Sequence, residues 1–214
     1  MALTAREQGR FSARWWRENI ESLLWAVAIA LTIRTFIMAP FKIPSGSMHP
    51  TLIEGDRILV NKFLYHVRSP HRGEIVVFYY PKEWHSFPER LHTLLDAGRP
   101  LPERVSGFFT AGRPFIKRLI ATGGDQVEIQ DGQAVVNGQP LSGAEVFHAK
   151  RYVNDGPYGQ VHQIIQVPDG QFYVLGDNSR SSHDSRFWGF VPKKLLIGRA
   201  VCIFWPPHRL RGLQ

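Results

Sequence analysis

The hydrophobic pattern of this chain begins with one long apolar run. Residues 22–41 read SLLWAVAIALTIRTFIMAPF and contain a single charged residue, Arg34. A helix of that length spans about 30 Å, the thickness of one hydrocarbon core. Arg34 lies near the far end, where its side chain can reach the head groups, and Pro40 is expected to end the helix. The pattern predicts a transmembrane helix over residues 22–41.

The charges around this run predict its orientation. Four arginines precede the run, whereas Lys42 is the one charged residue between it and Glu54. Basic residues collect on the cytoplasmic side of a membrane span. We therefore expect residues 1–21 to be a cytoplasmic basic segment and residues 42–214 to lie on the opposite side of the membrane.

Two other interpretations of the run are weaker. A cleavable signal peptide would need a cut site of small residues after the run, but Ala39 is followed by Pro40, which is unfavourable at a cut. An amphipathic surface helix would need an apolar stripe, whereas here apolar residues surround the helix. The sequence shows no second span, so the rest of the chain is expected on one side of the membrane.

Beyond the apolar run the pattern changes to short β-branched and aromatic segments. Turn residues separate these segments: Asp131-Gly132 predicts a hairpin, and Asn137-Gly138 is expected to end the next strand. This pattern predicts a mainly β fold, an antiparallel sheet or barrel. Residues 82–113 interrupt it with an expected short amphipathic helix that ends at Gly98, so we interpret them as an inserted excursion.

Composition, net charge and cysteine content add three observations. Hydrophobic residues make up 43% of the 214 positions and charged residues 21%, which argues against a disordered chain. The net charge of +8 suits an anionic bilayer or nucleic acid, although a dispersed, solvated surface would explain it equally well. Cys202 is the only cysteine, so no intrachain disulfide can form, and its apolar neighbours predict a buried small side chain.

Two segments carry candidate chemistry. Ser45 and Ser47 flank Gly46 in a proline-bracketed loop directly after the apolar run, although a plain juxtamembrane linker has the same composition. Lys117 lies in the apolar segment FIKRLI. Burial there would lower its pKa, and a neutral lysine can activate a serine hydroxyl. In a strand, Arg118 would point to the opposite face and stay hydrated.

Histidine and metal chemistry are less well supported. His183 adjoins Asp184, but neighbours in an extended segment point apart, which disfavours a Ser-His-Asp triad. The other histidines are scattered, and no paired metal-ligand spacing occurs. We expect neither a metal nor a cofactor.

Five sequence blocks, taken in order, resemble type I signal peptidases, which are bacterial inner-membrane enzymes. The resemblance runs from Phe36 to Trp205 and rests on the blocks FKIPSGSMHPTL, GDRILVNKF, RGEIVVF, FIKRLIATGGD and GDNSRSSHDSRFWGFVP. It implies a Ser-Lys serine protease of the cell membrane that removes signal peptides from preproteins, cutting after small-x-small sites. Its partners would be preproteins and the lipid bilayer, and not nucleic acid.

The resemblance also implies roles for individual residues. Ser47 matches the nucleophile, Lys117 the general base, and Ser45 a hydroxyl that joins the backbone N–H of Ser47 in an oxyanion hole. Ser182 matches a serine that bonds the lysine amine. The supporting charged positions are Asp177, Asp184 and Arg186. The positions that match the lining of the substrate pockets are Phe41, Ile43, Pro44, Met48, Leu52, Ile58, Val77, Phe115 and Ile116.

The chain departs from the family pattern in several places. The block GDNRxxS is GDNSRSS here, which displaces Arg180 by one position, and Gly123 replaces a proline. The stretch between the lysine and the GDN block is short, which implies a reduced second lobe at about residues 126–172. The excursion at residues 82–113 is longer than the family pattern implies.

Two other functions fit parts of the sequence. A self-cleaving repressor would share the dyad but needs a DNA-reading helix pair, where this chain has an apolar run. A non-catalytic anchored β-module would use the basic body to bind anionic lipid or nucleic acid.

Overall fold

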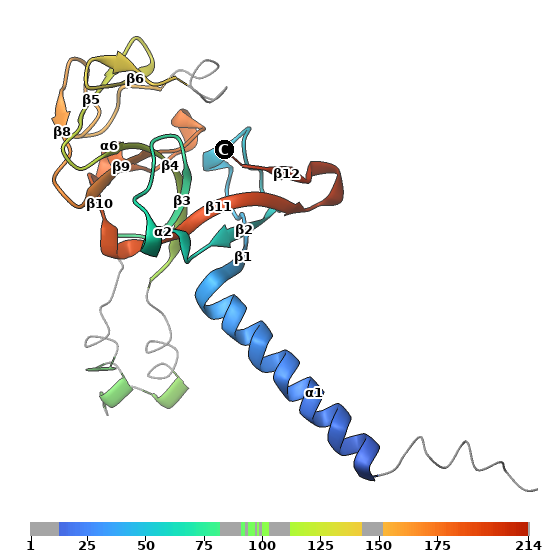
Figure 1. Ribbon diagram of the computed structural model, residues 1–214. Coiled ribbons are helices and arrows are strands. Elements are labelled where there is room, and N and C mark those ends of the chain that lie inside the picture. The colour runs from blue at the N-terminus through green and yellow to red at the C-terminus, as the bar shows by residue number, and fades with distance from the viewer. Residues whose placement is uncertain are drawn as a thin grey trace, which may run out of the picture.

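The computed structural model describes residues 13–81, 91–92, 94–96, 98, 100–102, 112–142 and 152–213. A single long helix projects from a β-rich body that contains two sheets (Figure 1). This arrangement confirms the predicted mainly β fold with an N-terminal apolar helix and a small second lobe.

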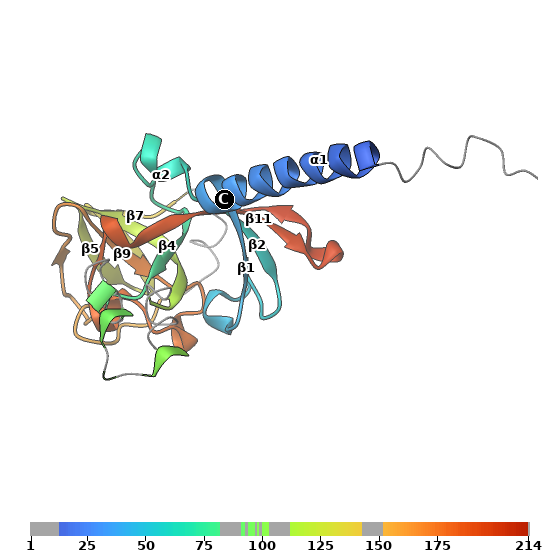
Figure 2. The ribbon, with the colours of Figure 1, turned by 90° about the horizontal axis from the view of Figure 1, so that it is seen from below.

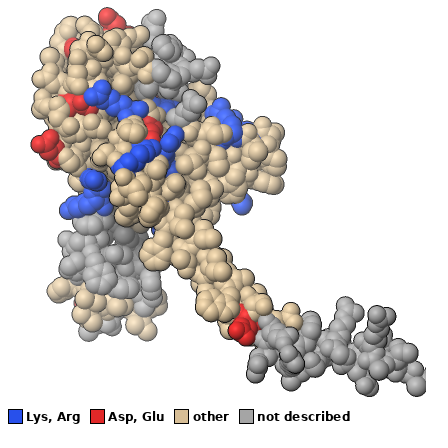
Figure 3. All heavy atoms as spheres, viewed as in Figure 1, with Lys and Arg blue, Asp and Glu red and all other residues tan. Residues whose placement is uncertain are grey.

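The long helix is α1, Ala13–Thr32, and it continues as a π-helical turn, Ile33–Ile37. The stretch Asn19–Ile37 is long and apolar enough to cross a membrane, and none of it is buried against the body. Figure 3 shows its visible face without charged side chains from the body almost to its far end. Residues 1–12, which hold two of the four predicted cytoplasmic arginines, lie outside the described residues.

The prediction that Pro40 ends the helix was wrong. Helical structure ends at Ile37, and Pro40 lies inside strand β1, Met38–Lys42, opposite Leu59. The residue before a proline avoids helical geometry, so the chain is already extended at Ala39. β1 ends the strand order of its sheet, and an edge strand tolerates a residue without an N–H group.

The large sheet is antiparallel and follows the order β1-β2-β11-β3-β4-β9-β10, with β12 paired to β11. In Figure 2, β1, β2 and β11 lie side by side beneath the body end of α1. The bounds are β2 Arg57–Asn61, β3 Ile75–Tyr79, β4 Pro114–Thr122, β9 Gln171–Leu175, β10 Val191–Pro192, β11 Leu196–Trp205 and β12 Arg211–Gly212.

The second sheet follows the order β7-β6-β5-β8 and forms the reduced lobe. Its strands are β5 Gln126–Gln130, β6 Gln133–Val136, β7 Gln139–Pro140 and β8 Ile165–Gln166. The hairpin predicted at Asp131-Gly132 is confirmed, and Asn137-Gly138 ends β6 as predicted and also forms a tight turn into β7. Asp131 and Asn137 have φ values of 50° and 53°, each followed by a glycine at 76°, the left-handed pair that a tight hairpin requires.

The other helical elements whose bounds the structure describes are short. They are α2 Leu64–Val67, α6 Ser185–Trp188 and the 3-10 turns Gly46–Met48, Ser179–Ser181, Lys193–Leu195 and Pro207–Arg209. About half of the helix predicted in the excursion lies outside the described residues, and within the described part Leu91, His92, Leu94 and Leu95 are helical.

The described residues of the body form three apolar clusters. One packs β2, β3 and β11 around Ile58 and Val77, a second packs the opposite face around Phe78 and Trp188, and a third joins β4 and β9 to the small lobe. Cys202 on β11 is only half-buried, contrary to the prediction, because its neighbour Ile203 takes the core-facing position on that strand.

Candidate active site

The site is built around Ser47 and Lys117, which lie 70 residues apart in the sequence. Ser47 lies in the 3-10 turn Gly46–Met48, a few residues after β1, and Lys117 lies in the middle of β4. The Lys117 Nζ donates a hydrogen bond to the Ser47 Oγ across 2.8 Å. Lys117 is 3% exposed and Ser47 is 8% exposed, so both residues are largely withdrawn from water.

Burial changes the acid-base behaviour of Lys117. Desolvation is the main cause that lowers the pKa of its amine from 10.5 to about 8, and the nearby carboxylates of Asp184 and Asp177 oppose this shift. Nζ also donates to the Ile116 carbonyl at 3.0 Å and lies 5.7 Å from the centre of the Phe115 ring. A substantial fraction of the amine is therefore neutral near pH 8, when it can accept a proton.

A cleft of about 330 Å³ opens beside the pair. Its apolar wall includes Pro44, Phe115 and Ile116, three of the predicted substrate-contacting residues. Ser45 also lines it, so the structure brings the two predicted serines and the lysine to one cavity. The described residues that line the cleft are Pro44, Ser45, Ser47, Arg113, Pro114, Phe115, Ile116, Lys117, Ser181 and His183.

The other predicted substrate-contacting residues do not line this cleft. Phe41 packs against the apolar cluster of β2, β3 and β11. The remaining five, which are almost wholly buried in that cluster, are Ile43, Met48, Leu52, Ile58 and Val77. Met48 belongs to the Ser47 turn itself, so this turn is anchored in the cluster through its side chain.

Ser182 is buried close to the dyad, but it does not bond the lysine. No partner is found for its Oγ among the described residues, whereas the amine donates to Ser47 and to a main-chain carbonyl. The predicted Ser182–Lys117 hydrogen bond is therefore not present in this structure.

The prediction that Arg118 stays hydrated was wrong. Arg118 is 1% exposed and binds Asp177 in a bidentate pair, with Nε–Oδ1 and Nη2–Oδ2 distances of 2.9 and 2.8 Å. A third bond runs from Nη1 to the Gly73 carbonyl at 2.6 Å. These bonds compensate the loss of hydration, because a buried guanidinium is tolerated when it is paired and hydrogen-bonded. Asp177 also accepts from the Thr51 hydroxyl, close to Ser47 in the chain.

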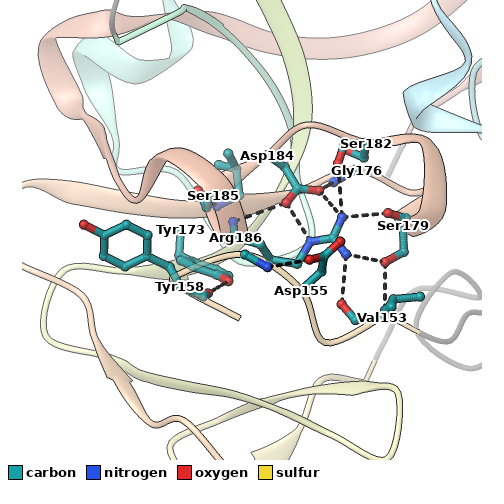
Figure 4. A network of polar contacts seen from close by, with 12 residues as sticks. Val153, Asp155, Tyr158, Tyr173, Gly176, Ser179, Ser182, Asp184, Ser185 and Arg186 are labelled. Carbon is teal, nitrogen blue, oxygen red and sulfur yellow. Dashed lines mark hydrogen bonds and ion pairs between the residues drawn. The ribbon is translucent and has the colours of Figure 1, made fainter. Parts of the chain in front are cut away.

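A second buried pair joins Asp184 and Arg186 (Figure 4). Arg186 donates through Nε to Asp184 Oδ1 at 2.8 Å and through Nη2 to Oδ2 at 2.9 Å. It also donates to the carbonyls of Val153 and Ser182 and to both oxygens of Ser179. Asp184 further accepts from the Gly176 N–H at 3.0 Å. The pair thereby ties α6 to the loop beside Ser47.

The departures from the family pattern have local explanations. Ser179 stands where the family has arginine, and it serves as an acceptor for buried Arg186, while Arg180 is exposed. A Cβ at Gly123 would lie 2.9 Å from the main chain of Pro168 to Gly170, so a side chain at this position would need the neighbouring backbone to move.

The loop after β9 contains residues that the sequence analysis did not assign. Gly176 lies so close to the Ser47 carbonyl that an added Cβ would be 2.6 Å from it. The Asn178 N–H donates to the same carbonyl at 2.9 Å, and the Asn178 side chain donates to the Gly46 carbonyl at 3.1 Å. The GDN sequence was the available signal, but its partner lies about 130 residues earlier.

The histidine alternative gains no support from the geometry. The His183 ring stacks on Phe187 at 5.1 Å between centroids, while the Asp184 carboxylate points to Arg186 and Gly176. Within the part of the chain that the structure describes, no group of three His, Cys, Asp or Glu side chains could hold a metal ion.

Comparison with known proteins identifies the family. The model of the signal peptidase family, peptidase S26, matches residues 16–205. A signal peptidase I from Leptolyngbya laminosa is 39% identical over 196 residues, which cover 92% of this chain and 83% of the relative. A probable signal peptidase I-2 from Synechocystis sp. is 39% identical over 195 residues, covering 91% of this chain and 76% of the relative.

A crystal structure of a signal peptidase I from Enterococcus faecalis V583 is 26% identical, covers 62% of this chain and 97% of the other, and gives a TM-score of 0.41. The matches in sequence show that this chain belongs to the peptidase S26 family and is a serine peptidase, a hydrolase. Its relatives are named signal peptidase I, so the family activity is the removal of signal peptides.

Proposed function

We propose that this protein is a membrane-anchored endopeptidase that cuts signal peptides from secreted preproteins, with Ser47 as nucleophile and Lys117 as general base. The observation that carries the proposal is the buried hydrogen bond of 2.8 Å between the two side chains, together with the lowered pKa of the lysine. A serine hydroxyl needs such a base to attack a peptide carbonyl.

The steps follow from these positions. Neutral Lys117 takes the proton of the Ser47 hydroxyl as Oγ attacks the scissile carbonyl. The negative oxygen that develops is held by the Ser47 N–H and the Ser45 hydroxyl, which lines the same cleft. The lysine then gives its proton to the leaving amine, and an acyl group remains on Ser47. A water molecule activated by Lys117 releases that group and restores the site.

The cleft suits an extended peptide segment with small side chains beside the bond that is cut. Pro44, Phe115 and Ile116 provide apolar contact in a cavity of about 330 Å³, which suits small side chains at the first and third positions before the cut. An extended peptide would bind through main-chain hydrogen bonds, as peptides do when they lie along a strand.

We place the enzyme in a bacterial cell membrane with α1 as its anchor. The stretch Asn19–Ile37 supports this by its length and apolar composition. The arginines before it favour a cytoplasmic N-terminus, so the cleft would face the outside, where preproteins emerge.

The test is cleavage of a purified preprotein by wild type, Ser47→Ala and Lys117→Ala, with the products identified by mass spectrometry. Lys193→Ala, which removes an exposed lysine, is the matched control. Wild type and the control should cut after a small-x-small site, and both dyad variants should lose activity to a similar degree, because the two residues act as a unit. Turnover by Ser47→Ala at the wild-type rate would overturn the proposal.

A further inference from the structure

The loop after β9 is hydrogen-bonded to the turn that carries Ser47. Asn178 makes two hydrogen bonds to it, one from its main chain to the Ser47 carbonyl at 2.9 Å and one from its side chain to the Gly46 carbonyl at 3.1 Å. The first bond survives any substitution at this position except proline. The second depends on the asparagine amide, and so it can be removed alone.

The side-chain bond acts on one particular peptide group. The peptide between Gly46 and Ser47 is trans, because the described cis bonds are at His49-Pro50 and Trp205-Pro206. In a planar trans peptide the N–H points opposite to the C=O. The Gly46 carbonyl accepts from the Asn178 amide and from the His49 N–H, the latter at 3.1 Å. Two donors on the oxygen therefore fix the direction of the Ser47 N–H.

We propose that Asn178 is a positioning residue that aims the Ser47 N–H at the negative oxygen formed in the reaction. This inference rests on the proposed function, in which Ser47 is the nucleophile. Asn178 and Gly46 are not among the described residues that line the cleft, so the amide acts through the peptide and not on substrate. A hydrogen bond to the carbonyl also polarises the peptide, which makes its N–H a stronger donor.

The first test is the kinetics of Asn178→Ala with a preprotein substrate. Loss of a complete oxyanion donor costs about 10²–10³-fold in kcat, so a misdirected donor should cost about 10–100-fold with KM little changed. The rise of activity with pH should keep its midpoint, because the lysine is untouched. Asn154→Ala is the matched control, since the Asn154 amide also donates to a main-chain carbonyl, that of Ile129 in the small lobe, at 2.9 Å.

The second test separates aiming from general damage. A substrate peptide that ends in an aldehyde forms a negative oxygen when Ser47 adds to it, whereas the same peptide ending in an alcohol does not. Asn178→Ala should weaken inhibition by the aldehyde about as much as it lowers kcat/KM and leave inhibition by the alcohol unchanged. If this variant does not fold, Asn178→Leu fills similar space without a donor and takes its place.

The outcomes are distinct from those of the dyad test. Unchanged kcat and aldehyde affinity in Asn178→Ala, with Ser47→Ala inactive, would overturn the role of Asn178 and leave the proposed function standing. Equal weakening of the aldehyde and the alcohol would also overturn it, because that result indicates a distorted cleft. Activity in Ser47→Ala would overturn the proposed function itself.

Discussion

Arg186 holds both carboxylate oxygens of Asp184 at 2.8 and 2.9 Å, in a position where neither side chain is more than 1% exposed. The same guanidinium satisfies carbonyls of two other segments, those of Val153 and Ser179. Arg186 therefore joins α6 and the loop after β9 to the segment of Val153, beside the small lobe.

Arg186→Met should destabilise the protein strongly. Removing one partner of a buried pair leaves an uncompensated charge, which costs about 3–5 kcal/mol. Arg72→Met is the control, because Arg72 pairs with Asp125 but its side chain is 40% exposed. The Asp125 carboxylate is itself only 9% exposed, but without Arg72 it still accepts hydrogen bonds from Thr122 and from the Asn137 amide, so it is not left without partners. Thermal unfolding of both variants in detergent should show a large loss for Arg186 and a small one for Arg72; equal losses would contradict the central role of the Asp184–Arg186 pair.

Activity should rise with pH as Lys117 loses its proton. Burial lowers the pKa of its amine to about 8, so kcat/KM should increase through a single group with a midpoint near that value. A histidine base would instead give a midpoint near about 6.5. The measurement is the pH profile of wild type and His183→Ala between neutral and alkaline pH. Disappearance of the rise in His183→Ala would rule out the lysine mechanism.

The same shift predicts that the lysine weakens the fold. The unfolded amine has a pKa of 10.5 and the folded one about 8, so the unfolded state binds more protons between these values. The cost is fully present below about pH 8 and disappears as the pH rises toward 10.5. Lys117→Met should therefore stabilise the protein at pH 7 by up to about 3 kcal/mol. Thermal unfolding at pH 7 and pH 10.5 should show this gain only at the lower pH; a destabilised variant at pH 7 would contradict it.

Replacing Ser45 and replacing Ser182 should lower kcat to different degrees. Ser45 lines the cleft, so Ser45→Ala should lower kcat about 10²–10³-fold as a lost oxyanion donor. The Ser182 hydroxyl lacks a partner among the described residues, so Ser182→Ala should change kcat much less and leave the pH midpoint in place. Steady-state kinetics of the two variants checks the order, and a larger loss for Ser182 would show that it bonds the lysine during catalysis.

The orientation in the membrane can be read by cysteine labelling. In a Cys202→Ser background, Leu210→Cys places a thiol at a site that is 69% exposed, and Ser12→Cys places one before the helix. A maleimide that cannot cross membranes should label position 210 in intact spheroplasts and position 12 only after lysis. The reverse pattern would invert the proposed topology.

Local signals in the sequence predicted much of this molecule. The short β-branched and aromatic segments predicted the strands, the Asp-Gly pair predicted a hairpin and the Asn-Gly pair a strand end, and both pairs have the backbone angles of a tight turn. The order of the blocks predicted that Ser47 and Lys117 meet, and the two atoms lie 2.8 Å apart. The predicted catalytic roles rest on that geometry and await the kinetic tests.

The failures share a physical cause, which is a partner far away in the chain. Arg118 looked solvent-exposed because strand alternation cannot show that Asp177, 59 residues later, would pair with it. The GDN sequence drew attention to Asn178 but could not show its role, because its acceptor lies in another segment. Pro40 looked like a helix stop, although pairing with β2 had already drawn the chain into a strand.

The helix that begins as α1 continues without a linker into β1, and this limits how far Ser47 can lie from the membrane. About ten residues separate Ile37 from Ser47, a path of at most about 35 Å even when fully extended. The Lys62 N–H also binds the Ile37 carbonyl at 2.8 Å, which fastens the helix end to the sheet. With α1 across a bilayer, the reactive hydroxyl stays at a nearly constant height above the lipid. A preprotein peptide bond that follows suitable small side chains would then remain uncut when it lies too far from the membrane surface.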